Sequence, residues 1–510
     1  MFEHRLCQAL TSRVISLNQP FSCFDFIEGM FGSGQNAIHR CFSLARSFET
    51  QTLVLEELDP LGEGIILAEN KELQIRYPEY KSQYLYRLSF WQKEIKSIED
   101  LTMDDNESLV GYAIIKNDCI PKHDATHVFE AVFRKYSHKH NCVRKGQSFD
   151  VRVGNSIFSA QGALFAQQNG ISKCCAHVAL YTILCNNFPD KEPSFAQMTQ
   201  IVNGLHKESL DLNPYEIRKI LDFYGLEYHD IYYPSPGEQE CIENKDDLLI
   251  PFNKLIYAGI ESGAGALAGF MLSKGGGHII PFWGHTFNKD TWVSDAELFY
   301  FKTGEIAYAP SENWTSSFIG HDDNFGPNLC VPKLYLTKKQ VNYVVEIFRP
   351  GVKFSGAKAE IAAYQLFYSI LQFIKRNPNI NKWTSRAYLA FISKRIVLRT
   401  VSLEKSEYLE SLKNLKDWEN NSEDEKIIDF LAEHLPEYIW LTEFSLPQLF
   451  PANERKIGEI ILDATQYLDS NNSQAVFLAA RFPSNWYFPN EDGTFLSISS
   501  TLVSHTPNFC

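Results

Sequence analysis

Several features that mark particular classes of protein are absent from this sequence. No stretch of the 510 residues approaches the roughly 18 uncharged apolar residues of a membrane-spanning helix, so we expect no membrane span. The residues Met1–Cys7 lack a basic segment leading into an apolar core, so we expect no secretory signal peptide. There is no internal repeat and no low-complexity tract, so we expect neither a repeat architecture nor a compositionally biased segment.

The sequence has fewer basic than acidic residues, and the spacing of its cysteines matches no disulfide framework. Lys and Arg number 48 against 62 Asp and Glu, which gives a net charge of −14 and argues against general nucleic-acid binding, because that function needs a basic face. The 11 cysteines are odd in number and show no framework spacing, which indicates reduced thiols in a cytosol. We therefore expect a cytoplasmic protein that binds neither nucleic acid nor membrane.

What is present is typical of a soluble, folded protein of two or three domains, with 44% hydrophobic and 22% charged residues. We expect an N-terminal α/β region of unknown role at 1–109, a catalytic domain at 110–345, and a helical plus β region at 346–510 that covers or extends the core. Within them the patterns predict a strand at 52–58, an amphipathic helix at 83–95, a helix from an Asn213 cap to a Gly225 stop, a helix at 357–376, and strands at 438–445 and 457–465.

The first chemical motif surrounds a pair of cysteines. Gln167 and Gln168 precede Cys174 and Cys175, and an apolar run at 178–184 follows. This arrangement predicts a buried helix that begins at Cys175. The positive end of a helix favours the thiolate form of a cysteine placed there, and a glutamine upstream can donate its amide to an oxyanion.

Two further motifs supply a base and an acid. His278 follows a run of glycines and opens an apolar stretch, which predicts a histidine at the start of a strand. Another predicted strand ends in Asp322 and Asp323, and an acid there is able to fix the tautomer of the histidine. Asp295 is a competing acid, because it is nearer to His278 in the chain.

A group of soft metal ligands precedes these motifs, but its spacing is not that of a zinc site. Zinc sites show two close ligand pairs on short, defined spacings, and this group fits that pattern only loosely. We therefore interpret its members as ordinary side chains and expect no metal and no cofactor. The members are Cys119, His123, His127, His138, His140 and Cys142.

The stretch Cys175-Ala-His-Val-Ala-Leu resembles the nucleophile helix of papain-like cysteine peptidases, especially the branch that processes bacteriocin leader peptides. In that branch a glutamine stands about six residues before the cysteine. Gln168 stands six residues before Cys174 and seven before Cys175, and the Ala-Leu pair selects Cys175. The stretch 277–284 resembles the histidine strand of the family, and Asp322 with Gly326 resembles its acid-ending strand. The chain is also similar to bacterial proteins of this fold that carry the same motifs.

The resemblance covers roughly 110–345 and implies an α+β fold with a papain-like core, in which the nucleophile helix packs on an antiparallel sheet. It implies a cysteine peptidase or amidase that forms an acyl-thioester on Cys175 of a peptide or protein substrate. In that mechanism His278 is the base, Asp322 orients it, and Gln168 holds the oxyanion.

Several alternatives stay open at this level. Cys174 competes as nucleophile, Asp323 or Asp295 as orienter, and Gln167 or Asn169 as oxyanion donor. The same residues also suit a thiol acyltransferase of the transglutaminase type, or a catalytically silent scaffold that binds proteins.

Overall fold

The computed structural model describes most of the chain. The described residues are 3–19, 21–134, 141–143, 146–172, 174–191, 193–202, 212–233, 250–271, 277–288, 298–339, 341–376, 382–415, 425–451, 454–469, 472–500 and 506–509. They form a mixed α+β fold, as the sequence predicts, in two compact units. Unit 1 comprises Met1–Gly225, Leu267–Gly284 and Phe318–Tyr343, and unit 2 comprises Leu226–Ala266, His285–Ser317 and Val344–Cys510. This division differs from the expected boundaries, because two segments between 226 and 317 group with the C-terminal region.

A seven-stranded sheet forms the base of unit 1. Its strand order is β1-β2-β3-β4-β5-β8-β7, and every neighbouring pair is antiparallel. The strands are β1 (Thr11–Ser16), β2 (Thr52–Leu58), β3 (Lys81–Trp91), β4 (Leu109–Ile120), β5 (His123–Phe133), β7 (Gln147–Val153) and β8 (Ser156–Phe165). The expected boundary after residue 109 therefore falls at the start of β4, which pairs with β3 on one side and β5 on the other. Residues 1–109 are part of the same sheet as the residues that lead to the cysteine motif.

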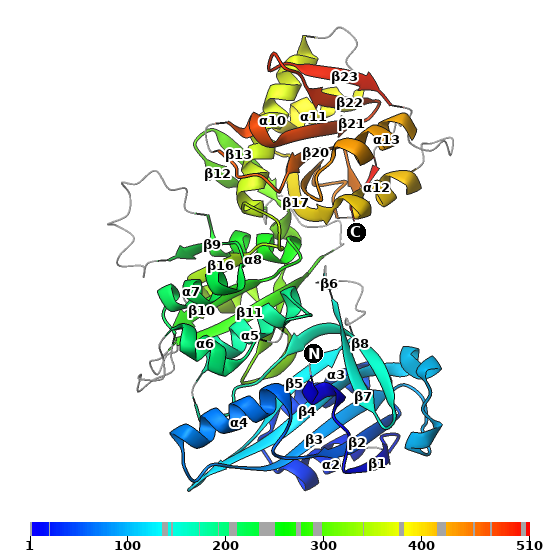
Figure 1. The fold of residues 1–510 in the computed structure, drawn as a ribbon. Coiled ribbons are helices and arrows are strands. Elements are labelled where there is room, and N and C mark those ends of the chain that lie inside the picture. The colour runs from blue at the N-terminus through cyan, green and yellow to red at the C-terminus, as the bar shows by residue number, and fades with distance from the viewer. Residues whose placement is uncertain are drawn as a thin grey trace. The chain divides into compact units, whose positions relative to one another are not determined.

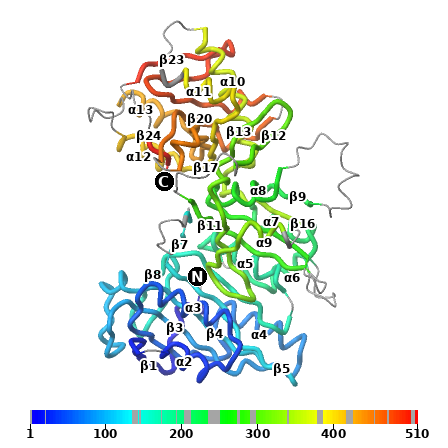
Figure 2. The backbone as a smooth tube through the Cα atoms, turned by 180° about the vertical axis from the view of Figure 1, so that it is seen from behind, coloured from blue at the N-terminus to red at the C-terminus, as the bar shows by residue number. Residues whose placement is uncertain are grey.

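The two faces of this sheet differ in chemistry. Helices α2 (Ser22–Phe31) and α3 (Asn36–Ser47) cover one face, as the backbone in Figure 2 shows. Their side chains and those of the strands form an aliphatic and aromatic core there. Helices α1 (Glu3–Leu6) and α4 (Gly64–Arg76) lie on the other face, toward the viewer in Figure 1. Because side chains alternate along a strand, β4 sends Ala113 and Ile115 into the apolar core and Lys116 to the opposite face.

Buried charges hold this second face together. The Glu130 carboxylate on β5 accepts hydrogen bonds from Arg5 Nε at 2.6 Å and Arg5 Nη2 at 2.7 Å, and it lies 3.1 Å from His4 Nε2. Tyr112 and Tyr181 donate to the same carboxylate. Burial alone would raise the pKa of Glu130, but the charges of Arg5 and His4 outweigh burial and hold that pKa well below its usual range.

A second group of strands and helices completes unit 1 and carries the chemical motifs. Strands β15, β14, β11 and β10 are neighbours in that order, and α5, α6 and α7 pack on one another. The α7 start matches the prediction, because Asn213 and Glu216 form a capping box and Gly225 ends the helix with φ of 75°. The elements are β6 (Asn141–Val143), α5 (Cys175–Asn187), α6 (Phe195–Ile201), α7 (Pro214–Tyr224), β10 (Ala266–Met271), β11 (Gly277–Thr286), β14 (Ser317–Asp322), β15 (Gly326–Pro332) and α9 (Lys333–Lys339).

Unit 2 is built on an eight-stranded sheet of order β12-β13-β17-β18-β20-β21-β22-β23. Helix α10 packs on one face, and α12 with α13 packs on the other, so both faces are buried under apolar side chains. The strands are β12 (Phe301–Thr303), β13 (Ile306–Pro310), β17 (Val397–Glu404), β18 (Tyr438–Ser445), β20 (Gly458–Asp463), β21 (Phe477–Phe482), β22 (Asn485–Pro489) and β23 (Phe495–Ser499). The remaining helices are α8 (Phe252–Glu261), α10 (Gly356–Lys375), α11 (Lys382–Ile392), α12 (Lys405–Asn414) and α13 (Glu425–His434). Two further strand pairs are β9 (Tyr228–Tyr232) with β16 (Val341–Ile347), and β19 (Arg455–Lys456) with β24 (Thr506–Pro507).

One predicted element is wrong. The expected helix at 83–95 is the strand β3, although Leu85 and Leu88 are spaced as on a helix. The segment lies between β2 and β4, where both edges of its backbone are paired and its last five side chains are buried, so strand pairing decides its conformation. The other elements predicted above are confirmed to within a few residues. In the part of the chain that the structure describes, no helix combines the length and hydropathy that crossing a bilayer requires.

Candidate active site

The cysteine motif begins a helix, and the two cysteines have different environments. Helix α5 starts at Cys175, and Cys174 is its N-cap. Cys174 is buried, and burial raises the pKa of its thiol to about 12, so it is almost entirely protonated at neutral pH. Cys175 is partly exposed and occupies the first helical position, where free N–H groups point toward it. Of the two cysteines, Cys175 is the one placed to react.

His278 lies opposite this helix end. It is the second residue of β11, is only 7% exposed, and is close enough to Cys175 for that thiol to contribute to its raised pKa. The Cys175 Sγ atom is also 4.0 Å from the main-chain oxygen of Gly277. The His278 Nε2 atom faces Asp322 Oδ1 at 3.3 Å. The structure thus brings together the three residues that the sequence predicts as nucleophile, base and orienter.

The acids hold a proton on His278. Burial alone would lower the pKa of His278, but hydrogen bonds to Asp322 and Cys175 and the charges of the two acids outweigh burial and raise that pKa to about 10. Burial raises the pKa of Asp323 to about 6, with the charge of Asp322 adding to the effect and that of His278 opposing it. At neutral pH the arrangement therefore contains an imidazolium close to the Cys175 side chain.

Of the candidate orienting acids, Asp322 has the best geometry. Its distance to His278 Nε2 is 3.3 Å, against 3.6 Å for Asp323, and its Oδ1 also accepts a hydrogen bond from Asn324 N at 2.9 Å. Asp295 lies outside the described residues. Sequence reasoning missed Asn324, whose Nδ2 is 3.5 Å from His278 Nε2 and 3.1 Å from Asp323 Oδ1. In the sequence, the position of Asn324 directly after two acids at a predicted strand end was the signal that could have identified it.

The side chains of the candidate oxyanion donors differ in the hydrogen bonds that they already form. Gln167 pairs with Val128 of β5, because its Oε1 accepts from Val128 N at 2.9 Å and its own main-chain N donates to Val128 O at 2.9 Å. Asn169 is buried, and its Oδ1 accepts hydrogen bonds from Ile171 N and from Ser172 N and Oγ. The Gln168 side chain is half-buried and forms no hydrogen bond with another described residue. Gln168 is therefore the candidate whose amide is available to a substrate.

A buried charge network anchors the loop that precedes Cys175, and sequence reasoning did not find it. Asn169 Nδ2 donates to Glu69 Oε1 of α4 at 3.1 Å, and Glu69 Oε2 accepts from Lys116 Nζ at 2.8 Å. Lys116 also lies 3.0 Å from Asp118, and the opposing carboxylates outweigh burial and raise the pKa of Lys116. The network shows that residues 1–109, in which we found no catalytic motif, hold the loop that bears the oxyanion candidates.

Two groups of side chains have the residue types that bind metal ions. Three of the described members of the predicted soft-ligand group have separate local partners: His123 Nε2 lies 3.1 Å from Gly170 O, His127 Nδ1 lies 3.8 Å from Asp118, and Cys119 Sγ lies 3.8 Å from Ile120 O. The fourth, Cys142, is one of the side chains with a ligand atom placed to share a metal ion with other ligand types. His138 and His140 lie outside the described residues. By contrast, one ligand atom each of His278, Asp322 and Asp323 lies within 4.8 Å of the others, and Asp323 Oδ2 is buried without a partner among the described residues. These three side chains have the donor types that bind a divalent cation.

Comparisons of the chain with protein-family models, with curated proteins and with solved structures found no match.

Proposed function

We propose that this chain is a cysteine peptidase or amidase with a papain-like core, which cleaves a peptide or amide bond through an acyl-thioester on Cys175. The observation that carries the proposal is the group formed by Cys175, His278 and Asp322, in which Cys175 is at a helix N-terminus, contributes to the raised pKa of His278, and the acid lies 3.3 Å from a ring nitrogen of that histidine. The proposed nucleophile, base and orienting acid come from three distant parts of the chain and lie near one another, as a thiol hydrolase requires.

The first half of the reaction transfers the acyl group to the enzyme. The Cys175 thiolate attacks the carbonyl carbon, and the developing oxyanion accepts hydrogen bonds from Cys175 N–H and the Gln168 amide. The His278 imidazolium then gives its proton to the leaving nitrogen as the carbon–nitrogen bond breaks. An amine leaves, and the acyl group remains as a thioester on Cys175.

The second half regenerates the enzyme. Neutral His278 takes a proton from water, the resulting hydroxide attacks the thioester carbon, and the thiolate leaves as the carboxylic acid forms. Asp322 stabilises the imidazolium that reappears. An amine that replaces water would yield a new amide, so the acyltransferase alternative uses the same residues and differs only in the acceptor.

The proposal is tested by incubating the full chain with a mixture of synthetic peptides and following cleavage by mass spectrometry. We expect turnover by the wild type and by Cys174→Ala, and loss of turnover in Cys175→Ala and His278→Ala, because such residues act as a unit. Hydroxylamine added as a competing acceptor would yield hydroxamates if acyl transfer prevails. A chelator should leave turnover unchanged, which separates this mechanism from one that uses a cation at His278, Asp322 and Asp323.

Two results would contradict the proposal. Equal cleavage by Cys175→Ala would remove the nucleophile from the mechanism. No turnover and no thiol reactivity at Cys175, together with a stable partner recovered by the full chain, would favour the silent scaffold. None of the nine described cysteines forms a disulfide with another described residue, which supports our further proposal that the protein works in a reducing compartment such as the cytoplasm.

A further inference from the structure

The eight-stranded sheet of unit 2 ends in an open edge at β23. This strand, drawn in red in Figure 1, pairs with β22 on one side, and among the described residues no strand pairs with its other side. Its sequence is Phe-Leu-Ser-Ile-Ser, which contains neither a charged residue nor a proline. A strand of this kind at the end of a sheet presents a row of main-chain groups that another strand is able to bind.

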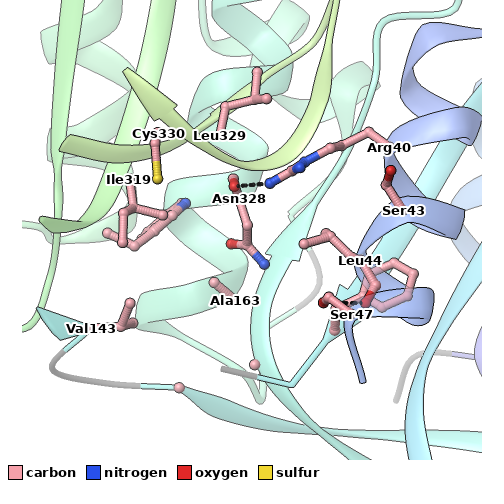
Figure 3. A pocket seen from close by; sticks show the side chains of 14 residues that line it. Arg40, Ser43, Leu44, Ser47, Val143, Ala163, Ile319, Asn328, Leu329 and Cys330 are labelled. Carbon is pink, nitrogen blue, oxygen red and sulfur yellow. Dashed lines mark hydrogen bonds between the residues drawn. The ribbon is translucent and has the colours of Figure 1, made fainter. Parts of the chain in front are cut away.

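The other ends of the three large sheets carry features that prevent such pairing. A charged side chain lies within each of β1, β7, β9 and β12, and two prolines lie within β15. In β15, Arg40 of α3 also donates to Pro327 O at 3.0 Å and to Asn328 O at 2.5 Å, and Figure 3 shows the contact with Asn328. The charged residues are Arg13 in β1, Asp150 and Arg152 in β7, Asp230 in β9 and Lys302 in β12. Among the described ends of these sheets, β23 alone lacks both kinds of protection.

The pairing with β22 shows which main-chain groups of β23 face the open edge. Ser500 N donates to Ser484 O at 2.9 Å, in register with the β22–β23 pairs. Hydrogen-bonded and non-hydrogen-bonded pairs alternate along an antiparallel ladder, so every second residue before Ser500 also faces β22. The main-chain groups of Phe495, Ser497 and Ser499 therefore point away from β22, toward the open edge.

A row of apolar side chains reaches the same edge. Leu496 and Ile498 lie directly opposite Phe488 and Trp486 of β22, so they share the face of the sheet that packs against α12 and α13. Phe488 and Trp486 are buried, whereas Leu496 is 55% exposed and Ile498 is 39% exposed. A strand that binds here must therefore supply apolar side chains at alternate positions as well as main-chain hydrogen bonds.

We propose that β23 pairs with β23 of a second copy of this chain, antiparallel about a two-fold axis at Ser497. In that register Phe495 faces Ser499 of the other copy and Ser497 faces its own counterpart, so three pairs of outward-facing residues exchange two hydrogen bonds each. Leu496 faces Ile498 of the other copy on both sides of the axis, which continues the apolar row. Because β23 carries no charged side chain, no like charges of the two strands meet at the axis. The inference is independent of the proposed peptidase activity.

Sedimentation velocity of the full chain from about 1 to 200 μM tests the proposal. An interface built on one short strand is smaller than the standard size, so we expect a dimer with a dissociation constant of roughly 1–100 μM. Leu496→Lys/Ile498→Lys places like charges opposite each other and should raise that constant at least about tenfold. Ile157→Lys is the matched control and should leave it unchanged, because Ile157 is also 39% exposed but lies in β8, an inner strand of the seven-stranded sheet.

A variant with opposite charges tests the register. In Leu496→Lys/Ile498→Glu each lysine faces a glutamate of the other copy, so at low salt this variant should associate at least about tenfold more tightly than Leu496→Lys/Ile498→Lys. Ser497→Pro removes an N–H that faces outward and leaves the ladder with β22 in place, so it should abolish the dimer by a different route. Thermal unfolding of each variant reports whether it folds.

Four results would overturn the proposal. A wild-type chain that stays monomeric at about 200 μM would leave the edge to a strand of another protein. A dimer that Leu496→Lys/Ile498→Lys leaves intact would place the interface elsewhere, as would a dimer that Ile157→Lys dissociates. Equal association of the two double variants would exclude this register.

Discussion

The reactivity of two neighbouring cysteines gives the sharpest test of the candidate site. The full chain is alkylated with iodoacetamide at pH 7, as wild type, Cys174→Ala and Cys175→Ala, and the modified peptide is quantified over time. A pKa of about 12 leaves roughly one Cys174 thiol in 100,000 ionised at this pH, and only the thiolate reacts. Because the pKa of His278 is about 10, Cys175 has a protonated imidazole beside it under the same conditions. We expect Cys175 to react at least about 100-fold faster than Cys174.

His278→Ala extends this prediction to the imidazolium. Two opposite charges about 4 Å apart attract by about 4 kcal/mol near a protein surface, and the desolvation of both groups offsets part of this. We therefore expect His278→Ala to slow alkylation of Cys175 by roughly 10- to 100-fold. His39→Ala is the matched control, because His39 is a partly exposed histidine of the same unit that faces Glu28 on the helix before it.

Three outcomes would refute this reasoning. Alkylation of Cys174 at the rate of Cys175 would show that burial does not protect it. An unchanged rate in His278→Ala would show that the imidazolium does not activate the thiol. An equal loss of rate in His39→Ala would show that the effect is general and not specific to the site.

Four further predictions concern the acids. Asp322→Asn removes the first partner that raises the pKa of His278 above its ordinary value, so the alkaline fall in kcat that we expect near pH 10 for the wild type should move to lower pH in a pH–rate profile. Burial raises the pKa of Asp323 from 3.8 to about 6, so this acid lowers the free energy of unfolding progressively between about pH 4 and pH 6, and the cost is complete above pH 6. Asp323→Asn should therefore raise the free energy of unfolding in urea at pH 8 by up to about 3 kcal/mol, with no gain at pH 4. Glu130→Gln leaves the buried Arg5 without a carboxylate and should cost about 3–5 kcal/mol in the same assay. Glu69→Ala should slow alkylation of Cys175, whereas Glu69→Gln should retain much of the rate because its amide oxygen still accepts from Asn169.

Local signals in the sequence were sufficient to predict the end of a helix wherever the residues at that end specify it. The capping residues Asn213 and Glu216 and the stop at Gly225 predict α7 closely, because each satisfies a backbone group within a few residues. The start of α5 at Cys175 was predictable for a similar reason, since a polar loop is followed directly by an apolar run. The same logic placed His278 at the start of β11.

Contacts between distant residues were not predictable in this way. Strand β3 was mistaken for a helix because its spacing alone does not reveal that it is paired on both edges. Glu69 and Asn169 are 100 residues apart and give no shared pattern, so their bond was visible only in the structure. The distances to His278 that distinguish Asp322 from Asp323 depend on the geometry of the turn after β14. Because the two acids are adjacent in the sequence, their positions in it do not indicate which one lies nearer to His278.

The order of the strands in the seven-stranded sheet has a consequence for synthesis of the chain. Each of the strands β1 to β4 pairs with the next strand along the chain, so this part of the sheet can form in sequence order as the chain emerges. The helix that begins at Cys175 follows, but its histidine is more than 100 residues later and Asp322 later still. In the mechanism we propose, a nascent chain therefore has Cys175 in place long before the base that would act on it. That mechanism could operate only after the strands bearing His278 and Asp322 are complete, which is when most of unit 1 has been made.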